Sequence, residues 1–133
     1  MAKLIVGLGN IGERYALTRH NLGFLVADEL CSAFKNNSKL KAQIGEVHLA
    51  GKVLPCLKPQ TYMNLSGEAL RLYCAFYQIA PEDCLIIHDD LDLPFSSVKL
   101  KFAGGEGGHN GLKSISKSLG SNQYARLRLG IDR

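Results

Sequence analysis

Apolar residues along this chain fall into two patterns: short continuous runs, and positions spaced three or four residues apart. The continuous runs at 4–6 and 84–87 are typical of strands that are buried on both faces. Helical spacing begins after Asn21, after Ser66 and after the glycine-rich run 104–108. The pattern therefore predicts two fully buried strands and three helices, each helix with one apolar side.

The limits of the first two helices follow from where the spacing breaks. In the first helix the apolar positions continue as far as Ala33 and Phe34, so we expect it to run from Asn21 until the polar residues 36–38. The second helix is expected to end before Pro81, because proline cannot continue a helix.

Polar and apolar residues alternate in three further segments, 40–57, 98–102 and 126–131, which predicts strands with one solvated face. In 98–102 the two lysines share one side, so that side is expected to be the wet one. Strands and helices alternate without a repeat or a linker. The sequence thus predicts one α/β domain over residues 1–133, with a twisted, mixed and largely parallel sheet flanked by helices.

Length and composition narrow the class of protein. The chain has 133 residues, of which 46% are hydrophobic and 21% charged, values that exclude a disordered tail or a fibrous repeat. The apolar run Leu4 to Leu8 is too short for a signal peptide, and no stretch approaches the length of a membrane span. We therefore expect a soluble cytoplasmic protein. Its four widely spaced cysteines are expected to be buried free thiols.

The positive charge is concentrated at one end. The net charge of +4 divides into −1 for residues 1–95 (nine basic, ten acidic) and +5 for 96–133 (seven basic, two acidic). Such an asymmetry is typical of a protein that binds a polyanion such as nucleic acid. A solvated basic face that keeps the protein soluble explains the same numbers equally well.

Three short motifs resemble cofactor-binding or metal-binding motifs, but the residues around the first two do not fit such a site. Residues 7–12 match GxGxxG, but no helix begins at the third glycine and no second strand ends in an acidic residue, so a dinucleotide site is not expected. The carboxylates of 88–92 lack a second ligand group at metal spacing, so no metal is expected. The glycine-rich run 104–111 lacks the GK[ST] ending of a nucleotide loop, yet His109 and Asn110 at its end favour a functional loop.

The remaining polar residues favour hydrolysis by an activated water. No serine or cysteine lies in the context of a nucleophile. A histidine held by a carboxylate can act as a general base near neutral pH, and side-chain amides can position the water and stabilise an oxyanion. Asn10 follows the first buried strand and Asp89 follows the run 84–87, so both are expected at the sheet edge where sites form.

Four blocks of sequence, in order along the chain, resemble the bacterial peptidyl-tRNA hydrolase family. They are Leu4 to Asn10, Tyr15 with Thr18 to Phe24, Lys58 to Gly67, and His88 to Pro94 with Gly104 to Gly111. The resemblance implies an enzyme that cleaves the ester between peptide and tRNA, recycling tRNA from prematurely released chains. It further implies a metal-independent reaction without a cofactor, a monomer, and a cytoplasmic translation enzyme with no membrane association.

The resemblance also implies roles for individual residues. His20 is the general base, Asp89 orients it, and Asn10 places the water. The substrate-binding residues are Tyr15, Met63, Asn64, His109 and Asn110. The cations that face tRNA phosphate are Lys101 and Arg128, with Lys99, Lys113 and Arg126 as neighbours.

Two departures from the family pattern accompany these expectations. Ile11 stands where the family has proline, and this difference removes no chemical group from the expected site. The chain also stops at Arg133, so by this resemblance it lacks the family's lid and C-terminal helix. An RNA-binding protein without activity, built on the same fold, is the alternative hypothesis, and a metal-dependent phosphohydrolase is a third.

Overall fold

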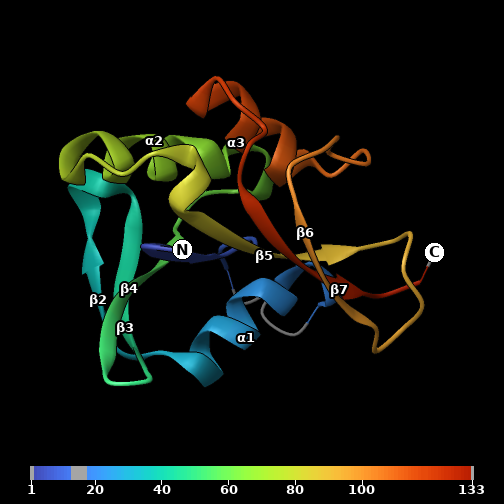
Figure 1. The fold of residues 1–133 in the computed structure, drawn as a ribbon, viewed down its shortest axis with the longest axis horizontal. Coiled ribbons are helices and arrows are strands. Elements are labelled where there is room, and N and C mark those ends of the chain that lie inside the picture. The colour runs from blue at the N-terminus through green and yellow to red at the C-terminus, as the bar shows by residue number, and fades with distance from the viewer. Residues whose placement is uncertain (1, 13–17, 133) are drawn as a thin grey trace.

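A computed structural model describes residues 2–12 and 18–132 of the chain. Within them, the strands are β1 (Leu4–Gly7), β2 (Ser32–Asn37), β3 (Ala42–Leu49), β4 (Lys52–Pro59), β5 (Cys84–Asp90), β6 (Val98–Phe102) and β7 (Ala125–Gly130). The α-helices are α1 (Leu22–Leu30), α2 (Ser66–Tyr77) and α3 (Asn110–Leu119) (Figure 1). Short 3₁₀ turns lie at Arg19–Asn21 and Met63–Leu65, directly before α1 and α2, and at Ser38–Leu40 and Pro81–Asp83.

All the described strands belong to one sheet, in the order β2-β3-β4-β1-β5-β7-β6. The four central strands β4, β1, β5 and β7 are parallel, whereas β2, β3 and β4 pair antiparallel, as do β6 and β7. The predicted single-domain α/β fold with a mixed sheet is confirmed, and its parallel part is the centre. β1 and β5 are neighbours with Gly7 opposite Ile87, so the residues after both strands meet at one edge.

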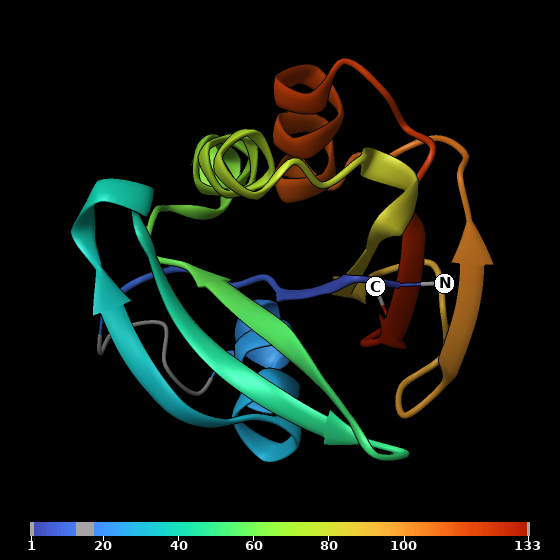
Figure 2. The same ribbon diagram turned by 60° about the vertical axis from the view of Figure 1, so that its left-hand side comes forward.

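Helices cover both faces of the sheet (Figure 2). On one face, α2 and α3 bury Leu70 and Ile115 against Leu4 and Ile86 of the central strands. On the other face, α1 packs Ala27 against the neighbouring side chains of the same two strands. The central strands are therefore covered on both sides, as their continuous apolar runs predict.

The prediction that the first helix reaches Phe34 is wrong. α1 ends at Leu30, Cys31 is extended, and Ser32–Asn37 form β2, which pairs with β3 and contains Ala33 at φ +57°. Phe34 packs into the core beside α1 from this strand. Pairing with β3 thus outweighs the helical spacing of Ala33 and Phe34, because local propensity is weaker than tertiary packing.

The prediction of four free thiols is wrong for two cysteines. Cys31, at the end of α1, forms a disulfide with Cys56 of β4, across 25 residues of sequence. Both side chains belong to the core cluster under α1, which brings them together although their spacing matches no motif. Cys74 and Cys84 are buried free thiols, as expected.

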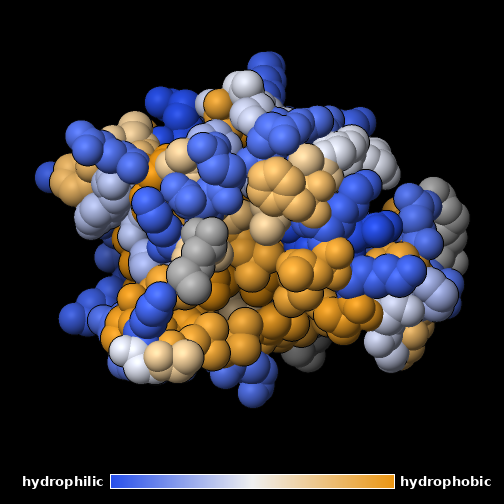
Figure 3. All heavy atoms as spheres, in the orientation of Figure 1, coloured by the Kyte–Doolittle hydropathy of each residue, from blue (hydrophilic) through white to orange (hydrophobic). Residues whose placement is uncertain are grey.

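The apolar side of β6 is exposed together with its lysine side. Val98, Leu100 and Phe102 are 61%, 72% and 55% exposed. β6 is the edge strand of the sheet, and α1 packs on β1, β4 and β5 rather than on this edge. Hydrophobic side chains accordingly reach the surface of the molecule, as Figure 3 shows for one face. None of the helices in the described part of the chain is long and apolar enough to cross a membrane.

Candidate active site

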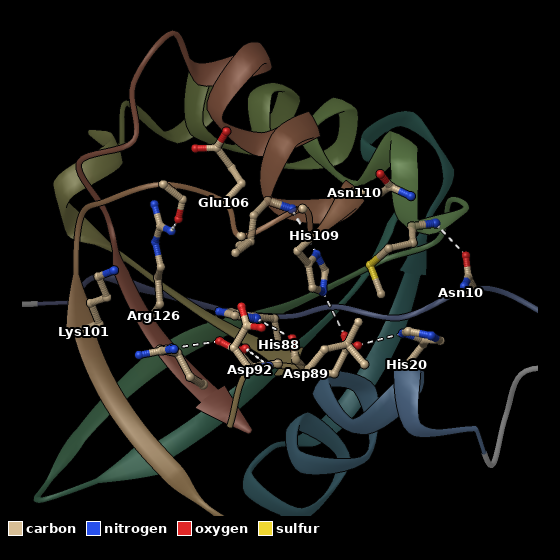
Figure 4. A pocket seen from close by; sticks show the side chains of 18 residues that line it. Asn10, His20, His88, Asp89, Asp92, Lys101, Glu106, His109, Asn110 and Arg126 are labelled. Carbon is tan, nitrogen blue, oxygen red and sulfur yellow. Dashed lines mark hydrogen bonds and ion pairs between the residues drawn. The ribbon is translucent and has the colours of Figure 1, made fainter. Parts of the chain in front are cut away.

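A cavity of about 570 Å³ opens where β1 and β5 end, beneath the 104–108 loop and the start of α3 (Figure 4). Most of the predicted site residues line it. They are Asn10, His20, Met63, Asp89, Lys101, His109, Asn110, Arg126 and Arg128. None of the described residues that line the cavity is a serine, threonine or cysteine, so a side-chain nucleophile of that kind is not at hand.

His20 and Asp89 form the centre of this site. The 3₁₀ turn before α1 presents His20, whose Nδ1 lies 2.7 Å from Oδ2 of Asp89. Asp89 is 2% exposed, whereas the His20 side chain is 57% exposed. Because an ionised carboxylate can only accept, Nδ1 of His20 carries the proton. In the neutral ring Nε2 is then the unprotonated nitrogen, which is the form that a general base needs.

A second histidine binds the other oxygen of the same carboxylate. His109 Nε2 lies 2.8 Å from Asp89 Oδ1, and Asp89 therefore lies between two imidazoles (Figure 4). On its other side, Nδ1 of His109 accepts the backbone N–H groups of Gly111 and Leu112 at 3.0 and 3.2 Å, so that His109 caps the N-terminus of α3. A nitrogen that accepts hydrogen bonds carries no proton, which places the ring proton on Nε2.

These contacts decide the charge of Asp89. Burial alone would raise its pKa, but the hydrogen bonds that it accepts from His109 and then His20 bring the pKa below its ordinary value. The carboxylate is therefore ionised at neutral pH. It accepts one N–H from each histidine.

Asn10 is fixed by a buried residue that the sequence analysis did not select. The backbone N–H of Asn10 donates to Asn21 Oδ1 at 2.8 Å, and Asn21 Nδ2 donates to the Asn10 carbonyl at 3.0 Å. Asn10 Oδ1 in turn accepts the backbone N–H of Met63 at 2.6 Å. Its amide group is therefore oriented, with Nδ2 left to donate. Asn21 lies at the N-cap position of α1, but its side chain makes no capping hydrogen bond there. Its position next to His20 is the sequence feature that could have indicated a role in the site.

His88 also lines the cavity and was missed. It is 2% exposed, its Nδ1 lies 2.7 Å from the Asp89 carbonyl, and its ring meets that of His109 edge to face at 5.1 Å. Burial lowers the pKa of His88 to about 4, so the ring is neutral at pH 7. Alternation along a strand would point His88 away from Asp89, yet both line the cavity near the end of β5, which stops at Asp90.

The predicted phosphate-binding cations divide into different environments. Lys101 is exposed and lines the cavity, while Lys99 and Lys113 are exposed and lie outside its lining. Arg128 donates from Nε to Asp90 Oδ2 at 2.8 Å. Burial would raise the pKa of Asp90, and the hydrogen bond from Arg128 brings it below its ordinary value.

The position of Arg126 beside Arg128 predicts that it faces solvent, but the structure places it in the interior. It is 2% exposed, and its guanidinium donates to the carbonyls of Gly105 and Gly104 at 2.5 and 2.7 Å. The ring of Tyr124 lies 4.5 Å beneath it. β7 is not an edge strand, and the glycine-rich loop covers this side chain. Arg126 lines the cavity, but its buried guanidinium is already bonded to the loop carbonyls, so it holds the loop in place.

Two predicted residues stand apart from this arrangement. Asn64 is exposed in the turn before α2, next to Met63 but outside the cavity lining. Tyr15 lies outside the residues that the structure describes. Within residues 2–12 and 18–132, no group of three histidine, cysteine or acidic side chains is arranged to hold a metal ion.

A parallel-centred α/β sheet with a histidine–carboxylate pair and the oriented amide of Asn10 at the ends of β1 and β5 suits a hydrolase that activates water. The profile of the Peptidyl-tRNA hydrolase family matches residues 4–133, and the chain belongs to this family. The chain is 48% identical to the peptidyl-tRNA hydrolase of Mycobacteroides abscessus, over 99% of this chain and 69% of that protein. It is 51% identical to the enzyme of Geobacter sp. strain M21, over 99% and 72%.

Solved structures lead to the same family. The crystal structure of peptidyl-tRNA hydrolase from Acinetobacter baumannii superimposes with a TM-score of 0.93 at 43% identity, covering 99% of this chain and 69% of that one. The likeness thus includes nearly all of the present sequence. The chain spans 69% of the length of that structure and up to 72% of the relatives named above.

Proposed function

We propose that this chain hydrolyses the ester that joins a peptide to the 3′ end of tRNA, with His20 as the general base. The observation that carries the proposal is the hydrogen-bonded series from His109 through Asp89 to His20. It leaves Nε2 of a half-exposed imidazole free to take a proton at the cavity, beside the oriented amide of Asn10.

The reaction then follows from these groups. Nε2 of His20 removes a proton from water as the water oxygen attacks the ester carbonyl, and Asp89 stabilises the imidazolium that forms. Nδ2 of Asn10 donates to the water or to the developing oxyanion. When the carbon–oxygen bond to tRNA breaks, the imidazolium returns the proton to the leaving 3′ oxygen. The products are tRNA and the peptide carboxylic acid, which releases the second proton of the water to solvent at neutral pH, and no metal enters the scheme.

The substrate extends from this centre in two directions. Met63, Asn64 and Asn110, together with Tyr15, are proposed to contact the peptide and the acceptor end. Lys101 and Arg128, with Lys99 and Lys113 further out, are proposed to bind tRNA phosphates. We further propose that the enzyme acts as a monomer in the cytoplasm.

The test is hydrolysis of N-acetyl-aminoacyl-tRNA by the wild type and by His20→Ala, with a full-length relative as positive control. Loss of a general base lowers kcat by about 10²- to 10⁴-fold, and KM changes little because the side chain is not the main binding contact. EDTA is expected to leave the wild-type rate intact. Full activity in His20→Ala would overturn the mechanism.

The assay also decides between the enzyme and the alternative. Salt-sensitive tRNA binding without cleavage at any enzyme concentration would leave an RNA-binding protein. Inhibition by EDTA would instead support the metal-dependent hypothesis.

A further inference from the structure

We infer that His109 is a positioning residue for Asp89, with its proton fixed on Nε2 by the N-terminus of α3, rather than a residue that binds substrate. The inference rests on the proposed function and deepens it, since it assigns a role within the same site.

The first step concerns the two nitrogens of His109. Nδ1 receives two backbone N–H groups, from Gly111 and Leu112, and these are among the N–H groups that a helix leaves unpaired at its start. With both donors aimed at Nδ1, a proton there would face the positive end of the helix. The ring is therefore neutral with its proton on Nε2, and Nε2 is the atom that meets Asp89.

The second step concerns what surrounds the ring. The His109 side chain is 12% exposed, against 57% for His20. One ring edge is held by the helix start, the other by Asp89, and the neutral ring of His88 packs against it. Both nitrogens already have partners. A substrate that bound to His109 would have to break one of these contacts, whereas Nε2 of His20 is open.

Each member of this series of contacts therefore has a separate role. α3 fixes the tautomer of His109, His109 holds Oδ1 of Asp89, and Asp89 Oδ2 is thereby directed at Nδ1 of His20. Without the N–H of His109, the carboxylate would be free to turn and would lose a bond that favours its ionised form.

Two substitutions separate capping from positioning. The amide of asparagine lies where Nδ1 of histidine lies, and asparagine is a preferred N-cap, so His109→Asn keeps the cap and loses the donor to Asp89. The amide nitrogen of glutamine reaches the place of Nε2, and glutamine is not a preferred cap, so His109→Gln keeps the donor and loses the cap. The two variants therefore form a matched pair.

We expect opposite results from them. His109→Asn lowers kcat about 10-fold or more, with KM unchanged and the thermal unfolding midpoint retained. His109→Gln retains more of the wild-type kcat than His109→Asn does and lowers the unfolding midpoint. The loss of activity that accompanies protonation of Asp89 moves to higher pH in His109→Asn, since Asp89 loses the bond that lowers its pKa. In an Asp89→Ala background, His109→Asn costs no more than about 2-fold, because the partner is gone.

Other outcomes overturn the inference. A rise in KM with unchanged kcat in His109→Asn would make His109 a substrate-binding residue. If both variants lost activity in proportion to the fall in their unfolding midpoints, the role of His109 would be structural only. The ¹⁵N chemical shifts of the wild-type His109 ring test the tautomer without any turnover: a protonated Nδ1 would refute the inference even in an active enzyme. An inactive wild type with Nε2 protonated would instead refute the proposed function alone.

Discussion

At the scale of single residues, the site depends on keeping one carboxylate charged in a place where burial opposes charge. Asp89 is 2% exposed, and the two imidazole N–H groups offset the loss of water. His88 is also buried but, among the described residues, makes no hydrogen bond to a carboxylate, and it is neutral at pH 7. Burial with a partner keeps Asp89 ionised, while burial without one keeps His88 neutral.

The neutral His88 predicts an acid-sensitive fold. The pKa of His88 is lowered from 6.5 to about 4 by burial, so between these pH values the unfolded chain binds a proton that the native chain does not. The free energy of unfolding therefore falls as the pH drops through this window, by up to about 3 kcal/mol. Asp89, whose pKa is also lowered, acts in the same direction below the pKa of an unfolded aspartate. Urea unfolding at a series of pH values measures the effect.

His88→Asn is the comparison for that series. Asparagine can still donate to the Asp89 carbonyl, does not titrate, and introduces a packing loss that is the same at every pH. We expect a smaller slope of unfolding free energy against pH in this variant. Equal slopes in the two proteins would show that His88 is not the group responsible.

At the scale of elements, the two helices on one face approach closely because α2 begins with a small residue. Gly67 of α2 donates its N–H to Ser114 Oγ of α3 at 2.9 Å, and an added Cβ would collide with the Ser114 carbonyl. Gly67→Ala is expected to force α2 and α3 apart and to destabilise the fold by about 1–3 kcal/mol. Arg71→Ala, at an exposed position of the same helix, should stay within about 0.5 kcal/mol of the wild type. Urea midpoints of both variants decide the matter.

The elements that the sequence predicts well are those in which one interaction dominates. α2, α3 and the central strands follow from apolar spacing, because burial decides their placement. The chain from Ala33 to Asn37 does not, because its conformation depends on pairing with β3, which no local pattern reports. The Cys31–Cys56 bond is hidden for the same reason.

The site divides in a similar way. The residues that carry a motif, His20 and Asp89, are predicted and lie in contact. Asn21, His88 and Arg126 have roles that arise only when the loop, helix and strand surround them, so spacing gives no warning of them. Alternation with Leu127 and Leu129 assigns Arg126 to a polar face correctly. It does not reveal that the 104–108 loop covers that face.

At the scale of the whole molecule, the basic C-terminal segment exposes fewer cations at the surface than the number of its basic residues implies. On β6 and β7, Lys99 lies opposite Arg128 and Lys101 opposite Arg126, which places four cations on one face of the sheet edge. Arg126 is buried and Arg128 is paired with Asp90. The lysines are therefore the cations of this group that are most open to a polyanion.

Lys101 and Arg126 are the matched pair that tests this view, since they are direct neighbours with opposite exposure. The affinity for tRNA is measured by fluorescence anisotropy over a range of KCl concentrations, in a His20→Ala background that prevents turnover. Lys101→Met should lower the slope of log K against log salt by about 1, because one phosphate contact and its released counterion are lost. Arg126→Met should leave the slope unchanged and reduce thermal stability, with Arg126→Lys as a milder variant should the first not fold. An equal fall in slope for both residues would mean that Arg126 reaches phosphate, and that the 104–108 loop opens when tRNA binds.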